Sequence, residues 1–569
     1  MKIETGKTVT IFAGRHRPAA VKHVPINAPT KPTPAKPIQA KTAPVKSAQP
    51  KITKPKPIQP KPVQPKPVKP KPVKPVVVNP AKETTPATGS GPIKVLFCIS
   101  EAQPYAATGG LGEVGGSLPK AIVADSKCVD IRVMIPLYQV VGSDVRKKFK
   151  FLGSTEIEFA KHKEYCGVLE YKEGPITYYF IDNEKYFRRE KLYGYEDDYE
   201  RFAFFSKACI DTFKITGFKP DIVHANDWHS GLAIVYLKTL YKDVKEFAKI
   251  KTLFTIHNIN YQGKVPYNFM TEILGLDYRQ KSILEYNNQI NFVKAAITCA
   301  DWVNTVSPTY AEELKTSEFA MGLDNCIYEN AHKLNGILNG IDYKYYNPKT
   351  DKELFANYDR KSLEGKAANK RGVQKLFQMQ VDALIPMVIY NGRLTGQKGV
   401  DLIKDVIDSI LAERIQMIVM GNGESRYENL FAYIESKYQG KFKALRYSNN
   451  LAKKLYAAAD LVLMPSLFEP CGLSQMIASR YGTVPIVRET GGLKDSIRDF
   501  GCEGGGNGYT FKNYTAEDML YSIRRGVQDF VDDGPEWDAR VRICMDRDFS
   551  WKGTVSEYIA LYKKVKKLK

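Results

Sequence analysis

Two cationic side chains in the second half of the chain are spaced in a way that suits a diphosphate. The segment YNGRLTGQKGVDLI (390–403) places Arg393 and Lys398 five residues apart, in a glycine-rich loop after an apolar run. A guanidinium offers a planar fork of donors and an ammonium a point charge, so together they complement two linked phosphates. Two solvated surface cations are the alternative, which the loop by itself leaves open.

A carboxylate in the same half lies between two glycine-rich turns. In MPSLFEPCGLSQMIASRYGTVPIVRETGGLKDSI (464–497), Glu469 is flanked by apolar segments, residues 472–474 open one predicted helix and residues 490–492 open another. Free N–H groups at the start of a helix attract phosphate. The segment therefore predicts a sugar held by Glu469 next to a phosphate.

Five glycines crowd the start of a predicted helix in the first half of the chain. They follow Thr108 and are Gly109, Gly110, Gly112, Gly115 and Gly116. Glycine weakens a helix, so its repetition here needs a reason. Either a ligand such as phosphate approaches bare backbone at 108–110, or the chain only makes a tight turn. The motif does not decide between the two.

Two clusters of histidine and amide side chains come at the ends of predicted strands. HANDWHSG (224–231) contains His224, Asp227 and Trp228, and TIHNINYQG (255–263) contains His257 and Asn258. In one interpretation, Asp227 holds sugar hydroxyls and Trp228 gives apolar support. In the other, Asp227 only caps a helix beside a packed tryptophan. Because such a cluster occurs at the ends of two strands, a purely structural role is less favoured for the two histidines.

Apolar segments of strand length alternate with helical patterns in two rounds. Those of the first round are 93–100, 129–138, 175–182, 221–227, 252–258 and 302–307. Those of the second round are 387–395, 415–423, 442–448, 461–466, 483–489 and 508–511. This alternation predicts an α/β protein with two Rossmann-like, doubly wound domains. Their strand ends would face a shared cleft, where such sheets bind ligands.

The boundaries follow from composition. We expect a tether at 1–92, a first domain at 93–345, a second domain at 346–547 and a final amphipathic, cationic helix at 548–569. Residues 1–92 hold 18 lysines and arginines, two glutamates and 20 of the 33 prolines. Such a segment is predicted to be disordered and extended. It is either a spacer or a polycationic arm for an anionic partner such as nucleic acid, wall polymer or membrane.

Composition also limits the class of protein. The net charge of +22 leaves only +6 for the 477 residues after the tether, so specific nucleic-acid binding is not expected of them. Nine scattered cysteines without a C-x-x-C pair predict reduced thiols, no zinc site and a cytoplasmic protein. Neither a signal peptide nor an apolar window of about 20 residues is present, so no membrane span is expected.

Taken in order, the motifs resemble the bacterial glycogen synthase and plant starch synthase family. They are TGGL, HxxDW, HNxxYQG, NGID, GRLTxQKG, EPCGLSQ and TGGLKD, and the resemblance covers about residues 93–566. It implies a retaining hexosyltransferase of the GT-B fold, an NDP-glucose:1,4-α-D-glucan 4-α-D-glucosyltransferase. The same fold implies that the final helix at 548–569 crosses back to the first domain. Such an enzyme transfers glucose from ADP-glucose, less often UDP-glucose, to the non-reducing end of an α-1,4-glucan such as glycogen. No metal and no cofactor are expected.

The resemblance also implies roles for single residues. The implied catalytic groups are Arg393, Lys398, Glu469 and His257, whose carbonyl would face the anomeric carbon. The implied donor-binding residues are Thr108, Gly109, Gly110, Asn258, Tyr447, Cys471, Gly472, Leu473, Thr490, Gly491 and Gly492, with Tyr447 stacking on the base. Asp227 and His224 would lie near the acceptor or sugar.

Two positions depart from the family pattern. Ala107 stands where the family usually has a lysine that contacts donor phosphate, and Ile477 stands where the wider superfamily often has a second glutamate. The first departure removes one positive charge from the set of cations expected to bind the donor diphosphate, of which Arg393 and Lys398 are the others. It motivates one alternative, a weakly active glucan-binding scaffold. The other alternative is a GT-B glucosyltransferase with a different acceptor. The choice of donor, the oligomeric state and regulation are not predicted.

Overall fold

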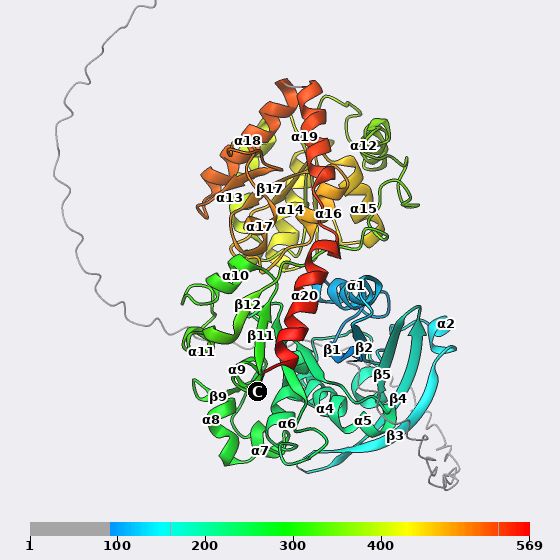
Figure 1. Ribbon diagram of the computed structural model, residues 1–569. Coiled ribbons are helices and arrows are strands. Elements are labelled where there is room, and N and C mark those ends of the chain that lie inside the picture. Colours follow the sequence, from blue (N-terminus) through cyan, green and yellow to red (C-terminus); the bar gives the residue numbers. More distant parts are fainter. Residues whose placement is uncertain (1–90, 160, 533, 569) are drawn as a thin grey trace, which may run out of the picture. The chain divides into compact units, whose positions relative to one another are not determined.

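The computed structural model describes residues 91–159, 161–532 and 534–568. The tether predicted at 1–92 lies outside these ranges except for its last two residues. Figure 1 shows the described part as two α/β lobes. The first lobe is built on the sheet that contains β1, and the second lobe on the sheet that contains β13.

The sheet of the first lobe has nine strands within the described residues, and β1 lies at the point where the strand order reverses. The strands, in spatial order, are β12 (Leu334–Gly336), β11 (Trp302–Thr305), β7 (Lys251–Ile256), β6 (Ile222–Asn226), β1 (Ile93–Cys98), β2 (Val129–Pro136), β5 (Ile176–Asp182), β4 (Lys163–Glu173) and β3 (Lys150–Glu158). All neighbours up to β5 are parallel, and β5, β4 and β3 pair antiparallel.

The larger helices of this lobe cover both faces of the sheet. They are α1 (Gly110–Asp125), α4 (Asp198–Asp211), α6 (Trp228–Lys238), α9 (Phe292–Cys299) and α20 (Trp551–Lys566). Helices α4, α6 and α9 pack side by side, and α1 packs against α20. Crossovers β1–α1–β2 and β6–α6–β7 run in opposite directions across the sheet. Right-handed connections therefore place α1 and α6 on opposite faces.

The shorter elements lie in the connections. They are α2 (Ser143–Arg146), α3 (Glu184–Phe187), α5 (Phe213–Thr216), α7 (Phe269–Glu272), α8 (Lys281–Leu284), α10 (Pro308–Glu313) and α11 (Asp324–Glu329). A small sheet contains β8 (Lys264–Val265), β10 (Gln289–Asn291) and β9 (Glu285–Tyr286).

The sheet of the second lobe is entirely parallel, and β13 marks its reversal of strand order. Its strands, in spatial order, are β15 (Phe442–Leu445), β14 (Gln416–Met420), β13 (Met387–Asn391), β16 (Leu461–Met464), β17 (Val484–Arg488) and β18 (Tyr509–Phe511). The surrounding helices are α12 (Glu364–Leu376), α13 (Val400–Ala412), α14 (Ser425–Lys437), α15 (Asn449–Ala458), α16 (Ser474–Arg480), α17 (Gly491–Ser496), α18 (Ala516–Asp532) and α19 (Gly534–Asp546).

The predicted α/β class with two doubly wound sheets is confirmed. Strands β13, β14 and β16 are buried along their whole length, as expected for parallel strands covered on both faces. Strands β3, β4 and β12 were not predicted from the sequence. Strand β3 is largely exposed and lacks the apolar run that identifies a central strand, because it lies at an edge of the sheet.

Two passages of the chain run side by side where the lobes are connected. The Ile341 N–H donates to the Phe549 carbonyl at 2.9 Å, and Ile341 forms a bridge with Ser550. A Cβ on Gly340 would lie 2.7 Å from the Trp551 nitrogen, so only glycine allows this approach. The chain then enters α20, whose buried side chains join the apolar core of the first lobe. In Figure 1, α20 lies beside α1.

Within the described residues, every helix is too short or too polar to traverse a bilayer.

Trp551 anchors α20, and its loss should destabilise the protein. The indole is 5% exposed, and its Nε1–H donates to the Ser117 Oγ at 2.8 Å. We expect Trp551→Ala to lower the free energy of unfolding by about 3–5 kcal/mol, because it leaves a cavity and removes the hydrogen bond to Ser117. The measurement is thermal and denaturant unfolding, with Lys563→Ala on the exposed side of the same helix as control. A loss of Tm no larger than that of the control would contradict the anchor.

Candidate active site

The polar segments predicted from the sequence all follow the carboxyl ends of parallel strands. In the first lobe they come after β1, β6 and β7, and in the second lobe after β13, β15, β16 and β17. The strand order reverses at β1 and at β13, so in each sheet the connections after the switch-point strand and after its neighbour leave toward opposite faces, which is where such sheets bind ligands. The expected placement of the site at the strand ends agrees with this topology.

Lys398 and Glu469 meet in the loops that follow two adjacent strands of the second lobe, β13 and β16. The Lys398 ammonium donates to Glu469 Oε2, and the Ser466 hydroxyl donates to the same oxygen at 3.0 Å. Glu469 is only 4% exposed, so a cation beside it compensates a carboxylate that is otherwise costly to bury. The structure therefore brings together the cation and the carboxylate that the sequence placed 71 residues apart.

Arg393 points across to the first lobe. Its Nη1 donates to the Tyr261 hydroxyl at 2.5 Å, and its Nη2 donates to Gln397 Oε1 at 3.3 Å. The Gln397 carbonyl in turn accepts from the Leu467 N–H at 2.9 Å, two residues before Glu469. Gln397 therefore ties the guanidinium to the segment that carries Glu469. The remaining guanidinium donors stay available for an anion.

Two glycines let the loops of the second lobe pack closely. Gly399 has a φ of +73°, and a Cβ there would lie 2.0 Å from the Pro465 carbonyl oxygen. Gly491 has a φ of +44°, and a Cβ there would lie 2.0 Å from the Glu469 carbonyl oxygen. Both positions bring neighbouring backbone against the Glu469 segment, so any larger residue would move the carboxylate.

Asp227 fixes the backbone of the second histidine cluster. Its Oδ1 accepts from the N–H groups of His257 at 2.7 Å and Asn258 at 3.3 Å, while its own backbone has a φ of +55°. The His257 ring is held by Asn226 Oδ1 at 2.9 Å. Burial raises the pKa of Asp227 to about 7. The side chain does not cap α6, and its proposed contact with a sugar stays a prediction.

His224 occupies a different place from the one expected. It is 1% exposed, and its ring nitrogens lie 3.0 Å from the Tyr562 hydroxyl and 2.7 Å from Thr255 Oγ1. Both nitrogens are thus engaged inside the core, between β6, β7 and α20. The expected contact of His224 with a sugar is corrected to a packing role, because a central strand points this side chain inward.

The five glycines near β1 divide into two groups. A Cβ on Gly115 would lie 2.2 Å from the Glu101 carbonyl oxygen, and one on Gly116 would lie 2.3 Å from that of Gln103. Gly112 similarly abuts Ala107. These three glycines serve the close packing of α1 on the loop before it. Gly109 and Gly110 do not, as a Cβ on Gly109 would meet nothing within 4 Å and one on Gly110 only the Leu473 side chain, at 3.6 Å.

The start of α17 already has an anionic partner from the first lobe. Glu313 Oε1 accepts from Thr490 Oγ1 at 3.0 Å and from the Gly491 N–H at 2.9 Å. In the reverse direction, Thr309 donates to Asp495 through its N–H at 3.0 Å and its hydroxyl at 2.6 Å. Burial raises the pKa of Glu313. A phosphate on Thr490 and Gly491 would therefore have to displace Glu313, so that predicted role is open.

The remaining predicted donor residues surround Glu469 or lie on its lobe. Gly492 packs on the Cys471 backbone, and burial raises the pKa of the Cys471 thiol to about 12, so the thiol is neutral. Gly472 has a φ of +70° just before α16. The Tyr447 ring is 49% exposed after β15, and its hydroxyl donates to Asn449 Oδ1 at 2.6 Å. An exposed ring face suits stacking, and that assignment remains a prediction.

Sequence reasoning missed several polar side chains that hold the site. Tyr261, Glu313 and Gln397 contact predicted residues, and Glu101 contacts the glycine-rich turn. Tyr261, Gln397 and Glu101 come within six residues of a strand end, which is the signal that would have found them, whereas Glu313 is the last residue of α10 and carries no such signal. Within the residues that the structure describes, no group of three or more histidine, cysteine or carboxylate side chains is arranged to hold a metal ion.

Comparisons with known proteins define the class. Residues 94–329 match the family model described as starch synthase catalytic domain, and residues 380–533 match glycosyl transferases group 1. The catalytic domain of starch synthase IV from Arabidopsis thaliana, solved with ADP and acarbose, aligns with a TM-score of 0.78 and 32% identity, covering 84% of this chain and all of that one. A sucrose-phosphate synthase from Thermosynechococcus elongatus shares the fold, with a TM-score of 0.52 and 17% identity. The chain is a two-domain GT-B glycosyltransferase.

Curated relatives specify the family within that class. The chain is 43% identical over 478 residues to the glycogen synthase of Clostridium botulinum (strain Alaska E43), covering 83% of this chain and 99% of the relative. It is 41% identical over 474 residues to the glycogen synthase of Anoxybacillus flavithermus, covering 83% of this chain and 97% of the relative. The chain belongs to the glycogen synthase family.

Asp227 should make stability depend on pH. Its pKa rises from 3.8 to about 7 because burial disfavours the charged form, so its contribution is full at acid pH and is lost as the pH rises through about 7. Asp227→Asn keeps the acceptor and removes the charge. We expect the Tm of the variant, relative to that of wild type, to increase between pH 4 and 8. The corresponding gain in the free energy of unfolding is up to about 4 kcal/mol.

The control for this comparison is Asp144→Asn, where the side chain is 90% exposed. Its Tm difference from wild type should not change with pH. A constant difference for Asp227→Asn as well would show that the buried carboxyl does not titrate in this range.

Proposed function

We propose that the protein transfers glucose from ADP-glucose to the non-reducing end of an α-1,4-glucan, with retention of configuration. The observation that carries the proposal is the convergence of Arg393, Lys398 and Glu469 at the strand ends of the second lobe. Arg393 also reaches Tyr261 of the first lobe. Family membership and the likeness to a starch synthase solved with ADP and acarbose support this choice of donor and acceptor.

The two cations act on the leaving group. As the bond from the anomeric carbon to the diphosphate breaks, negative charge grows on the phosphate oxygens. Arg393 and Lys398 then stabilise the transition state more than the ground state. The accessible backbone of this glycine pair, Gly109 and Gly110, lets the Gly110 N–H approach the phosphates from the first lobe. Two protein cations supply the neutralisation that a bound cation would otherwise give, so no cofactor is proposed.

The glucan hydroxyl attacks from the face that the diphosphate leaves. The leaving phosphate takes the proton of that hydroxyl, which retains the configuration without a protein nucleophile. The His257 carbonyl supports positive charge on the anomeric carbon, and Asp227 holds the backbone that orients it. Glu469 accepts hydrogen bonds from the donor glucose, and Tyr447 stacks on the base. Closure of the crevice would expel water and limit hydrolysis of the donor.

A donor and acceptor assay on the full chain tests the proposal. ADP-glucose and UDP-glucose are each supplied with glycogen or with a small acceptor such as glucose, and release of nucleoside diphosphate and incorporation of labelled glucose are measured. Transfer to glycogen with ADP-glucose as the better donor supports it. Transfer only to the small acceptor, or no diphosphate release with either donor, would overturn it in favour of another acceptor or a binding scaffold.

Both cations of the diphosphate clamp, which we define as Arg393 and Lys398, should be needed for turnover. Arg393→Ala and Lys398→Ala are each expected to lower kcat by at least about 10²-fold, because each removes charge stabilisation made in the transition state. Diphosphate release with ADP-glucose and glycogen measures this. Lys404→Ala, an exposed lysine on α13 just after the loop, is the matched control and should retain wild-type turnover. Near-normal kcat in either clamp variant would contradict the assignment.

Ala107 offers a gain-of-charge test. The residue is exposed at the front of the turn that carries Gly109 and Gly110. An added ammonium there should attract the donor phosphates, so Ala107→Lys is expected to lower the donor KM about fivefold, in line with about 1 kcal/mol for a partly solvated charge pair. Ala107→Gln controls for side-chain length. An equal KM in the two variants would show that this position does not reach the donor.

A further inference from the structure

Glu101 is a buried carboxylate directly behind the glycine-rich turn of the first lobe. It is 3% exposed, follows β1 by three residues, and no cation in the described part of the chain forms an ion pair with it. It is satisfied instead by hydroxyl and amide donors. Such a site is costly for a carboxylate unless its hydrogen bonds are complete, so each of its partners is held firmly.

Two of those hydrogen bonds come from a single residue of the turn. The Thr108 N–H donates to Glu101 Oε2 at 2.5 Å, and the Thr108 hydroxyl donates to Oε1 at 2.8 Å. Thr108 immediately precedes Gly109 and Gly110, whose backbone is accessible and whose φ and ψ would otherwise vary widely. Glu101 fixes the front of this glycine pair, and α1 fixes its back. The Gly109 N–H is itself directed at Glu101, so the free N–H group that these contacts orient is that of Gly110.

The third hydrogen bond connects Glu101 to the histidine cluster after β6. The Tyr193 hydroxyl donates to Glu101 Oε1 at 2.9 Å and lies 2.9 Å from the Ser100 hydroxyl. The Tyr193 ring packs on His229, with centroids 4.9 Å apart. Tyr193 thus touches both the turn after β1 and the start of α6. A shift of this ring would alter the support of both segments.

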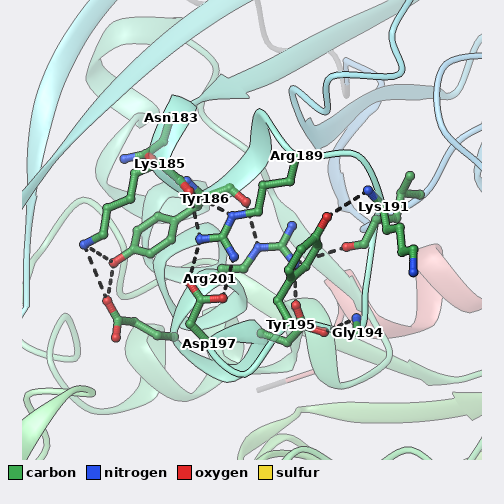
Figure 2. A network of polar contacts seen from close by, with 12 residues as sticks. Asn183, Lys185, Tyr186, Arg189, Lys191, Gly194, Tyr195, Asp197 and Arg201 are labelled. Carbon is green, nitrogen blue, oxygen red and sulfur yellow. Dashed lines mark hydrogen bonds and ion pairs between the residues drawn. The ribbon is translucent and has the colours of Figure 1, made fainter. Parts of the chain in front are cut away.

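The segment that carries Tyr193 is itself braced by two arginines, shown in Figure 2. Arg201 is 0% exposed and donates to the carbonyls of Tyr186 at 2.7 Å and Leu192 at 3.2 Å. Arg189 holds Asp197 through two hydrogen bonds of 2.5 and 2.6 Å. These contacts lie on either side of Tyr193 and leave its loop little freedom.

The Tyr195 ring lies close to both guanidinium groups, 4.9 Å from that of Arg189 and 5.1 Å from that of Arg201. The ring therefore adds cation–π contacts to the brace. The Lys191 N–H donates to the Tyr195 hydroxyl at 2.9 Å, which closes the loop on itself. These contacts thus connect the buried Arg201 to Leu192, the residue that precedes Tyr193.

From this chain of contacts we propose that Glu101 and Tyr193 are positioning residues for donor binding. Braced by Arg189 and Arg201, they hold Thr108 and the Gly109 N–H so that the next N–H group, that of Gly110, faces the donor diphosphate. The proposal rests on the proposed function and deepens it. Positioning matters here because Ala107 brings no charge to the turn and leaves recognition from this lobe to backbone groups.

The test compares Tyr193→Phe and Glu101→Gln with wild type in the full chain. Tyr193→Phe removes one hydrogen bond to Glu101 and keeps the ring, and Glu101→Gln turns an acceptor of the Thr108 contacts into a donor. We expect the Kd of ADP in calorimetry and the KM of ADP-glucose each to rise about tenfold, because a buried hydrogen bond to a charged group is lost. The KM of glycogen should stay unchanged, and the double variant should be no weaker than Glu101→Gln alone.

Tyr241→Phe is the matched control. Its hydroxyl also donates to a carboxylate, that of Asp211, and also contacts Lys207 at 2.9 Å, but none of these residues touches the turn. Its Kd and KM should equal those of wild type. A lower Tm for Tyr193→Phe and Glu101→Gln with unchanged Kd and KM would overturn the proposal and leave these residues a purely structural role. If wild type itself bound no ADP and transferred no glucose, the proposed function would fail instead.

Discussion

The buried contact between the Lys398 ammonium and the Glu469 carboxylate is the interaction on which the site of the second lobe depends. A carboxylate that is 4% exposed needs a cation, and a lone buried charge on either side would destabilise the fold. The pair thus holds the loops after β13 and β16 in one arrangement. Gln397 extends that arrangement to Arg393, so the electrostatics that stabilise the protein also orient the groups that would meet a diphosphate.

The first lobe uses carboxylates in another way. Glu101 and Asp227 are both buried, and both are occupied by backbone N–H groups of neighbouring loops. Burial raises the pKa of each. Their function in the described structure is to fix the path of the main chain at the strand ends. What this lobe then presents to a ligand is the open main chain at Gly109 and Gly110 and not a charged side chain.

Contacts between the lobes involve groups that a ligand would also use. Arg393 donates to Tyr261, and Glu313 accepts from Thr490 and Gly491. An anion that entered beside these groups would share or replace the present partners. The free energy of donor binding is therefore coupled to the relative arrangement of the lobes, since contacts within the protein must change as those to the ligand form.

The sequence by itself determined the α/β class, the two rounds of strands and helices, and the loops that carry the site. Strand pattern and turn glycines are local properties, and the carboxyl ends of parallel strands must share an edge of the sheet. From these properties, Arg393, Lys398 and Glu469 could be assigned to one edge before any coordinates. The family resemblance, carried by seven ordered motifs, was confirmed by the comparisons.

Only the tertiary structure decided which polar groups remain free for a ligand. His224 has the same sequence signature as His257, yet α20, more than 300 residues away in the chain, engages its ring in the core. Thr490 and Gly491 look like an anion site until Glu313 is placed on them, and the five glycines near β1 divide into packing and accessible positions only when α1 is docked. Hydrogen-bonding capacity is local to a residue, but its use depends on partners that folding brings from distant parts of the chain.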